Sequence, residues 1–307
     1  MKGLYLTAAL FGASSTASKV YTASYAGAVT TLEFGRSDSG YELTTISNTT
    51  DCGPNPSWLM LDADKNLLVC LDEGLNGPNG TLTSFEVDSD GSLSKIHHLE
   101  TVLGPVQSHL YSAGNRTFFA VAHYSGSSVT AYALNTNGVF THRQTFTYEL
   151  DGPGTDPDRQ EAPHPHGVVL DPTGQFILVP DLGATSCAFS ASTLRRACWN
   201  RRRLWQCLQA LVPDTAYSGR PRVHVQYPTN GTISFDKFFE TTTYGGPELP
   251  DGATAAEIAI SPANNHIVIS NREDNKFGTN NDTISVFSCA DASGESFTDV
   301  THTGLYP

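Results

Sequence analysis

A hairpin pattern that recurs along this chain limits the folds it can adopt. Residues 59–72, 168–181 and 258–271 align without gaps, and residues 110–123 align with a slightly different turn. Each copy has two short apolar runs around a turn rich in Asp, Asn, Pro, Ser or Gly, which is typical of a β-hairpin. Repetition of one hairpin along a chain predicts a β-repeat architecture.

The spacing and surroundings of these hairpins predict propeller blades. A further strand pair follows the hairpin at residues 80–96 and again at residues 128–141, so each repeat supplies four strands, the number in one blade. A β-sandwich with chance similarity between its hairpins is the alternative. The repeats begin for the most part about 50 to 60 residues apart, near Asn55, Gly104, Ala162 and Ala253.

The composition narrows both the fold class and the class of partner. The chain carries 31 acidic and 18 basic side chains, a formal net charge of −13, which would repel nucleic acid and anionic membranes. Aromatic residues make up 10% of the chain, and 27 glycines and 17 prolines suit many short strands joined by turns. We therefore expect a single all-β domain over residues 18–307 whose partner is a small molecule or a neutral polymer.

The N-terminal residues have the pattern of a secretory signal peptide. Met1 and Lys2 precede an apolar run at residues 4–13, and small residues follow at positions 14–18. This apolar run is too short to cross a bilayer. We expect residues 1–17 to be a signal peptide and the mature protein to be secreted, with a first β-strand as the alternative.

Five Asn-X-Ser/Thr sequons predict N-glycosylation of a secreted chain. They lie in Gly- or Asn-rich stretches that we expect to be turns, where a glycan can be carried. Such tripeptides also occur by chance, so they support secretion without establishing it. The sequons are at Asn48, Asn79, Asn115, Asn230 and Asn281.

The six cysteines are expected to form disulfides rather than a metal site. Disulfides are common in extracellular proteins, and Cys52 and Cys70 are the predicted pair because both belong to one local unit. The sequence contains no C-x-x-C pair with neighbouring histidines, so we expect no structural metal.

Several motifs are similar to those of one known family. They are NPSWL at residues 55–59, AHYSG at 122–126, RQEAPHPH at 159–166 and PDLGA at 180–184. With these motifs the chain resembles the lactonase family of seven-bladed β-propellers, which includes 6-phosphogluconolactonase-type propellers and fungal 3-carboxy-cis,cis-muconate cyclases. The likeness covers residues 19–186 and 228–303. It implies a propeller that acts without a cofactor on a small carboxylated lactone or its open form.

Two departures from the family pattern predict an incomplete propeller. Residues 187–216 hold five arginines, three cysteines and two tryptophans without strand alternation, which indicates an altered reading frame or retained intron, or else a lineage-specific loop. Residues 219–224 keep only a blurred Gly-Pro-Arg-His strand, so half a blade is expected to be missing within an anomalous segment, 187–226. The resemblance places one further blade after Pro307, and about five to six blades are therefore expected.

The resemblance also implies a set of catalytic residues. Propellers bind substrates where the innermost strands converge, so residues beside the first strand of each hairpin are candidates. The family pattern assigns catalysis to the His-Pro-His motif, the Arg of Gly-Pro-Arg-His, an acid on the next strand and a later Arg. The acid has no counterpart in this chain. Carried over, the catalytic candidates are His164, His166, Arg222 and Arg272.

Glu257 and His123 are predicted to contact the substrate, because each lies at the end of a hairpin strand. Each candidate also has a structural alternative. Glu257 can be a solvated strand end, and His123 a buried blade histidine, which is the alternative we favour. His166 can bind a neighbouring blade, and Arg272 can pair with Glu273 or Asp274 at the rim.

These residue types suit two related reactions. Cycloisomerisation of a 3-carboxymuconate needs arginines that bind carboxylates and a His or acid that delivers a proton. Lactone hydrolysis needs a base that activates water and cations that stabilise the oxyanion. We predict a lactonase or carboxymuconate cyclase. A secreted, non-catalytic glycoprotein that offers a binding surface is one alternative, because the acid is missing, and a cytoplasmic 6-phosphogluconolactonase is another.

Expression in a secreting eukaryotic host tests the signal peptide and the sequons together. We expect the secreted protein to begin near Ser18, because cleavage follows small residues, and glycosidase treatment to increase its electrophoretic mobility. N-terminal sequencing and gel electrophoresis measure both. A protein that keeps Met1 and shows no mobility change would contradict both assignments.

Overall fold

The computed structural model describes most of the chain, and its regular structure is almost entirely β-strand. Its described residues contain twenty strands and one short 3-10 helix, η1 (Ala63–Lys65), which confirms the all-β prediction. Within the described ranges no helix is both long and apolar enough to cross a membrane. The described residues are 18–37, 40–154, 156–171, 174, 176–184, 186–191, 220–226, 234–241, 243, 253–261, 265–272, 282–289 and 297–304.

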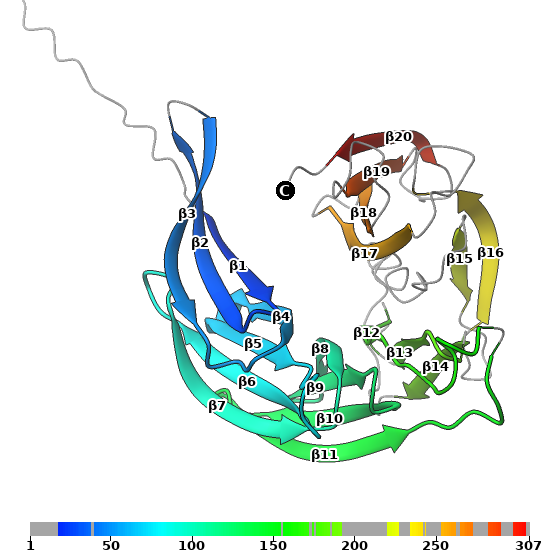
Figure 1. Ribbon diagram of the computed structural model, residues 1–307, viewed down its shortest axis with the longest axis horizontal. Helices are drawn as coiled ribbons and strands as arrows, with labels where there is room; N and C mark the ends of the chain where they lie inside the picture. Colours follow the sequence, from blue (N-terminus) through cyan, green and yellow to red (C-terminus); the bar gives the residue numbers. More distant parts are fainter. Residues whose placement is uncertain are drawn as a thin grey trace, which may run out of the picture.

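The strands form six antiparallel sheets that follow one another around a ring (Figure 1). The first sheet contains β1 (Ser18–Ser24), β2 (Ala28–Ser37) and β3 (Gly40–Thr49). The second contains β4 (Pro56–Asp62), β5 (Leu67–Asp72), β6 (Gly80–Val87) and β7 (Leu93–Thr101). The third contains β8 (Pro105–Ala113), β9 (Arg116–His123), β10 (Ser128–Leu134) and β11 (Phe140–Thr147). The fourth sheet contains β12 (Val169–Leu170), β13 (Phe176–Asp181) and β14 (Ser186–Ala191), and the fifth contains β15 (Arg220–Gln226) and β16 (Ser234–Thr241). The sixth contains β17 (Thr254–Ile260), β18 (His266–Arg272), β19 (Thr283–Cys289) and β20 (Phe297–Gly304).

The sheets are propeller blades. In the sheets β4–β7, β8–β11 and β17–β20, four neighbouring strands follow in chain order from the centre of the ring to its rim (Figure 1). The remaining sheets have two or three strands among the described residues. The described residues form six sheets, where five to six blades were expected. The two-stranded sheet β15–β16 borders residues outside the described part, so the missing half-blade stays a prediction.

The segment predicted to be anomalous, 187–226, is built into sheets at both ends. Its first residues belong to β14, which pairs with β13, and its last residues belong to β15, which pairs with β16. Residues 187–191 thus belong to a strand although their sequence lacks strand alternation, because backbone pairing does not require side-chain alternation. Residues 192–219 lie outside the described part.

The repeated hairpin forms the first two strands of a blade. The pairs β4–β5, β12–β13 and β17–β18 share one register, which gives equivalent positions to Met60, Val169 and Ala259. Asn66 and Gly174 have left-handed φ angles of 49° and 70° in their turns, as the turn chemistry predicts. The β8–β9 hairpin is tighter, because Ala113 pairs with Arg116, and its first strand is offset by two residues from the sequence alignment.

The apolar core lies between neighbouring sheets. Every residue of β5 is buried, because side chains alternate across a strand and this strand has a sheet on each side. Leu67, Val69 and Leu71 pack against the third sheet, and Leu68 and Cys70 pack against the first. This burial on both faces fixes the inner strands, whose ends form the centre of the ring.

The predicted disulfide between Cys52 and Cys70 is confirmed. Both cysteines are fully buried, with Cα atoms 5.9 Å apart. Cys52 lies on the connection between the first and second sheets, and Cys70 lies on β5. The bond therefore ties the connection between two blades to the buried strand that it approaches.

A buried polar side chain lies at, or one residue before, the end of the second strand of each aligned hairpin. Asp72 accepts hydrogen bonds from the backbone N–H groups of Asn55 and Gly74. Asn55 belongs to the connection that enters the blade and Gly74 to the loop that leaves β5, so one carboxylate satisfies two donors on different segments. The equivalent residues, which we call anchor residues, are Asp72, His123, Asp181 and Asn271.

Two other anchor residues bind the entering connection with different groups. Asp181 Oδ1 accepts a hydrogen bond from the backbone N–H group of His164 at 2.8 Å. Asn271 Nδ2 donates to the carbonyl oxygen of Thr243 at 2.9 Å. A hydrogen bond to the entering connection thus recurs at the anchor position, although the side chain accepts in Asp181 and donates in Asn271.

Three of the five predicted glycosylation sites lie in the described part. Asn48, Asn79 and Asn115 are exposed, which leaves them accessible to a glycan. Asn115 lies in the β8–β9 turn as expected, whereas Asn48 lies on β3 rather than in a turn. Asn230 and Asn281 lie outside the described residues, and glycosylation stays a prediction.

Removal of an anchor carboxylate should destabilise the fold strongly. We expect Asp72→Ala to lower the free energy of unfolding by about 3 kcal/mol, because it leaves two buried N–H groups without an acceptor. Asp64→Ala, at an exposed position in η1, is the matched control and should change the free energy by less than about 0.5 kcal/mol. Urea unfolding measures both, and equal stability of the two variants would contradict the assignment.

Candidate active site

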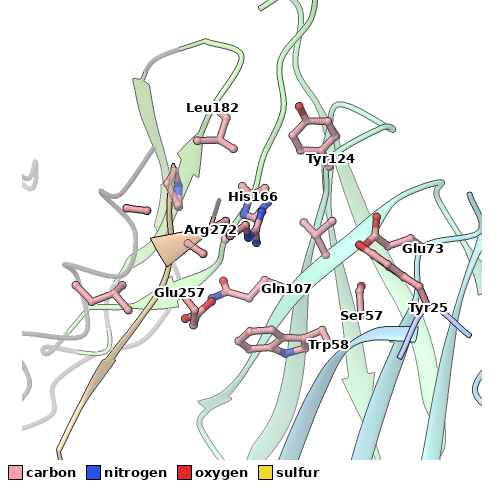
Figure 2. A pocket seen from close by; sticks show the side chains of 16 residues that line it. Tyr25, Ser57, Trp58, Glu73, Gln107, Tyr124, His166, Leu182, Glu257 and Arg272 are labelled. Carbon is pink, nitrogen blue, oxygen red and sulfur yellow. The ribbon is translucent and has the colours of Figure 1, made fainter. Parts of the chain in front are cut away.

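A cavity of about 330 Å³ lies beside the innermost strands. Five of the six sheets contribute to its walls, so it is a property of the ring and not of one blade (Figure 2). It is lined by Tyr25, Ser57, Trp58, Glu73, Val106, Gln107, Tyr124, His166, Gly167, Pro180, Leu182, Ala255, Ala256, Glu257, Ile258 and Arg272.

Most of these residues occupy three equivalent positions of the repeat. One position lies at the end of an inner strand. Glu73, Tyr124 and Leu182 directly follow the second strand of the hairpin, Arg272 is the last residue of that strand, and Tyr25 directly follows β1. Two adjacent positions at the start of the innermost strand hold the pairs Ser57 and Trp58, Val106 and Gln107, His166 and Gly167, and Ala256 and Glu257. The repeat therefore fixes the backbone of the cavity, and the side chains differ from blade to blade.

Irregular pairing at the start of the innermost strands directs these side chains to the cavity. A β-bulge places two residues opposite one and changes the direction of the side chains, and such bulges are common beside active sites. The register shifts occur between Pro56 and Trp58, between Pro105 and Gln107, and between Ala255 and Ile258.

The two histidines of RQEAPHPH have different surroundings. His166 lines the cavity, and its backbone N–H group donates to the carbonyl oxygen of Pro180 at 2.9 Å. His164 is 5% exposed, and its ring stacks on Tyr124 with 4.1 Å between centroids. Its Nδ1 lies 3.0 Å from the Tyr124 carbonyl oxygen and its Nε2 3.0 Å from Glu161 Oε1. Of these two histidines, only His166 lines the cavity.

His164 positions the cavity wall instead. Tyr124, which stacks on His164, also meets the His166 ring edge-on at 5.8 Å and 89°. The segment before these histidines is packed closely, since a Cβ atom at Gly183 would lie 1.8 Å from the carbonyl oxygen of Ala162. The His-Pro-His segment is thus held by contacts from two neighbouring sheets.

Arg272 and Glu257 line the cavity as predicted from the sequence. Both are exposed side chains, Arg272 at the end of β18 and Glu257 on β17. Figure 2 shows Arg272 and His166 on one side of the cavity. The alternative partners of Arg272, residues 273 and 274, lie outside the described part.

The opposite side carries a hydrogen-bonded Tyr–Glu pair. The hydroxyl group of Tyr25 donates to Glu73 Oε1 at 2.6 Å. Partial removal of this hydroxyl group from water and its bond to Glu73 raise the pKa of Tyr25 to about 12, while the positive charge of Arg272 acts in the opposite direction. Tyr25 is therefore a neutral donor at neutral pH, and Arg272 is close enough to affect it.

Ser57 and Trp58 also line the cavity. Ser57 Oγ and Trp58 Nε1 are shielded from solvent and have no hydrogen-bond partner among the described residues. Buried polar atoms are normally paired. Because both atoms are shielded from solvent, they lie behind the surface that a ligand in the cavity would contact.

His123 does not contact the cavity, so its prediction as a substrate-binding residue is wrong. It is fully buried, with Nδ1 2.9 Å from the Val102 carbonyl oxygen and Nε2 2.8 Å from Thr130 Oγ1. Burial lowers its pKa to about 4. His123 is the buried blade histidine that was the favoured alternative, and it serves as an anchor residue.

Arg222 lies on β15, where its backbone pairs with Phe239 of β16. The position of its side chain lies outside the described part, so its catalytic role stays a prediction.

Comparison with known proteins agrees with this architecture. The family model described as lactonase, 7-bladed beta-propeller, matches residues 18–189 and 222–307. The chain belongs to the lactonase propeller family. Its curated relatives include the protein named "Probable 6-phosphogluconolactonase" of Arthroderma benhamiae, which is 30% identical over 282 residues, 84% of this chain and 67% of the relative.

Solved structures share the fold of this lactonase propeller at lower identity. A Bacteroides fragilis protein has a TM-score of 0.64 and 19% identity, and the match covers 94% of this chain and 80% of that one. The periplasmic gluconolactonase of Pseudomonas aeruginosa has a TM-score of 0.61 and 20% identity, with 92% and 82% covered. These similarities support the fold.

Sequence reasoning missed several cavity residues of the lactonase propeller. Tyr25 follows β1, outside the aligned hairpins, whereas Glu73 and Tyr124 lie one residue beyond them. Extension of the alignment by one residue would have grouped Glu73 and Tyr124 with Arg272. Gln107 had no such signal, because the two-residue offset of the β8–β9 hairpin is not visible in the sequence.

The depressed pKa of His123 predicts a pH-dependent stability. Between pH 6.5 and about 4 the unfolded chain binds a proton at this residue and the folded chain does not, so stability falls as the pH falls through this window. We expect His123→Gln to reduce the pH dependence of the unfolding free energy, by at most about 1.4 kcal/mol per pH unit. Urea unfolding at pH values from about 4 to about 7 measures this pH dependence.

The matched control for this variant is His142→Gln, which changes an exposed histidine on β11. It should leave the slope as in the unmodified protein. An unchanged slope in His123→Gln would show that His123 titrates normally in the folded protein.

Proposed function

We propose that this lactonase propeller hydrolyses a small lactone in the cavity, with His166 and Arg272 on the reacting side. The observation that carries the proposal is that both family-derived candidates line one side of the cavity (Figure 2). Similarity to 6-phosphogluconolactonases supports lactone chemistry at the level of reaction class. The finer choice of substrate is part of the proposal.

His166 is assigned the role of general base. Its ring is oriented by edge contact with Tyr124, and its backbone is fixed by Pro180. In hydrolysis it takes a proton from water as the water oxygen attacks the lactone carbonyl carbon. The proton then passes to the ring oxygen as the carbon–oxygen bond breaks, which yields a hydroxy carboxylate.

Arg272 is assigned the stabilisation of negative charge. The carbonyl oxygen becomes an oxyanion when water adds, and a guanidinium group beside it lowers the energy of that state. The product is a carboxylate, which a guanidinium group can bind through two hydrogen bonds. A small carboxylated compound is therefore the expected partner on this side of the cavity, and no cofactor is needed for these steps.

Cycloisomerisation of a 3-carboxymuconate is the second candidate, because Arg272 also suits a carboxylate substrate. The Glu73 carboxylate on the other side would repel a tricarboxylate, which makes hydrolysis the better proposal. A secreted glycoprotein with a binding surface remains the non-catalytic alternative, supported by the N-terminal pattern and by three exposed sequons.

Activity of variants tests the proposal. We expect the protein to hydrolyse D-glucono-1,5-lactone, and His166→Ala and Arg272→Ala each to lower kcat/KM about tenfold or more, because each removes transition-state stabilisation. The matched controls His142→Ala and Arg143→Ala change exposed residues of β11 and should keep the activity. A pH-stat assay with the uncatalysed rate subtracted measures the rates.

Two outcomes would contradict this proposal. Cycloisomerisation of 3-carboxymuconate without lactone hydrolysis would favour the cyclase. Absence of both activities, with carboxylate binding retained and dependent on Arg272, would favour the binding-surface alternative.

A further inference from the structure

We infer that the outer face of the first sheet is the interface of a weak homodimer. We define the outer face as the face of β1–β3 that is turned away from the second sheet. The partner on this face is the same face of a second copy of the chain. The surface lies outside the cavity, so the inference does not depend on the proposed lactone hydrolysis.

The alternation of side chains along β2 defines the two faces of the first sheet. Val29 packs into an apolar cluster with residues of the second sheet, and Thr31 Oγ1 donates to the carbonyl oxygen of Gly91 at 3.1 Å. The alternate positions of β2, with their partners on β1 and β3, therefore lie on the outer face. The large apolar side chains of the outer face are Val20, Leu32, Phe34, Tyr41 and Leu43.

The outer face exposes large apolar side chains. Phe34 is 39% exposed, Leu43 58% and Tyr41 74%. The rings of Phe34 and Tyr41 stack with 5.5 Å between centroids, so they form one apolar surface without a partner sheet. None of the apolar clusters among the described residues includes a residue of this face. A contiguous exposed surface of this kind is typical of a protein interface.

The contrast with the other sheets indicates what covers this face. Every residue of β5 is buried, because the second sheet has a sheet on each side. In Figure 1 the first sheet is the first of the series, with the second sheet against one of its faces. Sheets pack face to face on sheets of similar length, and the same face of a second copy supplies such a sheet. A twofold dimer uses one patch on both copies and is the commonest homo-oligomer.

The charge of the outer face also favours a second copy. The chain has a formal net charge of −13, which opposes contact between two copies over most of their surface. The acidic residues of the three strands, Glu33 and Glu42, pair with Thr44 and Gly35 at positions of the opposite face. Arg36 is exposed one residue before the end of β2, at the edge of the outer face. Two copies can therefore meet here without opposing carboxylates.

The size of the outer face sets the expected affinity. Its strands have seven, ten and ten residues, which gives a face of about 14 by 33 Å, or about 450 Å² per copy. Two copies would then bury about 900 Å², less than the roughly 1,200 Å² of stable interfaces. We therefore expect a dimer with a Kd in the micromolar range.

Sedimentation velocity tests the inference on protein made in the bacterial periplasm, where disulfides form. A host that adds no N-glycans is needed, because Asn48 pairs with Thr30 on the outer face and a glycan there would cover it. We expect the monomer to convert to dimer as the protein concentration rises from about 1 to about 100 µM. Sodium chloride at about 0.5 M should strengthen the dimer, because it screens the repulsion between two acidic chains.

Variants assign the dimer to the outer face. Phe34→Glu and Leu43→Glu should each raise the Kd about tenfold or more, because each places carboxylates in an apolar interface. The matched control is Leu75→Glu, which changes a leucine that is 53% exposed in the loop between β5 and β6. It should change the Kd by less than about twofold. Thermal unfolding of all three variants reports whether the monomer stays folded.

Three outcomes would overturn the inference. A protein that stays monomeric at all concentrations would leave the face to a cover from within the chain. A dimer that Leu43→Glu and Leu75→Glu weaken equally would have its interface elsewhere. Growth into larger oligomers would contradict a twofold interface, because such an interface closes after two copies.

Discussion

The hydrogen bonds of the anchor residues fix the loops from which the cavity is made. A connection that enters a blade carries buried backbone groups, and an anchor side chain such as Asp72 or Asp181 supplies their partner. The residue after each anchor lines the cavity, because successive side chains of an extended backbone point in opposite directions. Glu73, Tyr124 and Arg272 therefore differ in chemistry while their backbone positions stay equivalent.

Contacts at the cavity are also contacts between sheets, so the site and the ring depend on each other. The Tyr25–Glu73 hydrogen bond joins the first and second sheets, and the stacking of His164 on Tyr124 joins the third and fourth. Strands such as β5 are buried on both faces and hold these sheets at fixed positions. A change between two blades is thus expected to affect the geometry of the side chains that line the cavity.

The local elements could be predicted from the sequence because they depend on local chemistry. Turn residues and alternating apolar runs indicated the hairpins, and proximity in one unit indicated the Cys52–Cys70 disulfide. The cavity was predicted in part, since His166, Glu257 and Arg272 flank hairpin strands. His123 shows the limit: its burial depends on the Val102 carbonyl group and on Thr130, which chain folding brings together. Bulges such as that before Trp58 depend on the paired strand and are not encoded in one segment alone.

The distribution of charge in the cavity has a consequence for the proposed reaction. A neutral lactone gains a negative charge when it is hydrolysed. Charged side chains of the cavity that interact weakly with the substrate therefore interact strongly with the product. Arg272 attracts the new carboxylate and Glu73 repels it. The product is therefore favoured with its carboxylate group at Arg272, and the opposite orientation is disfavoured. Because Tyr25 stays protonated up to a pKa of about 12, it keeps its bond to Glu73 throughout the neutral range. The position of the Glu73 carboxylate is thereby fixed while the charge of the ligand changes.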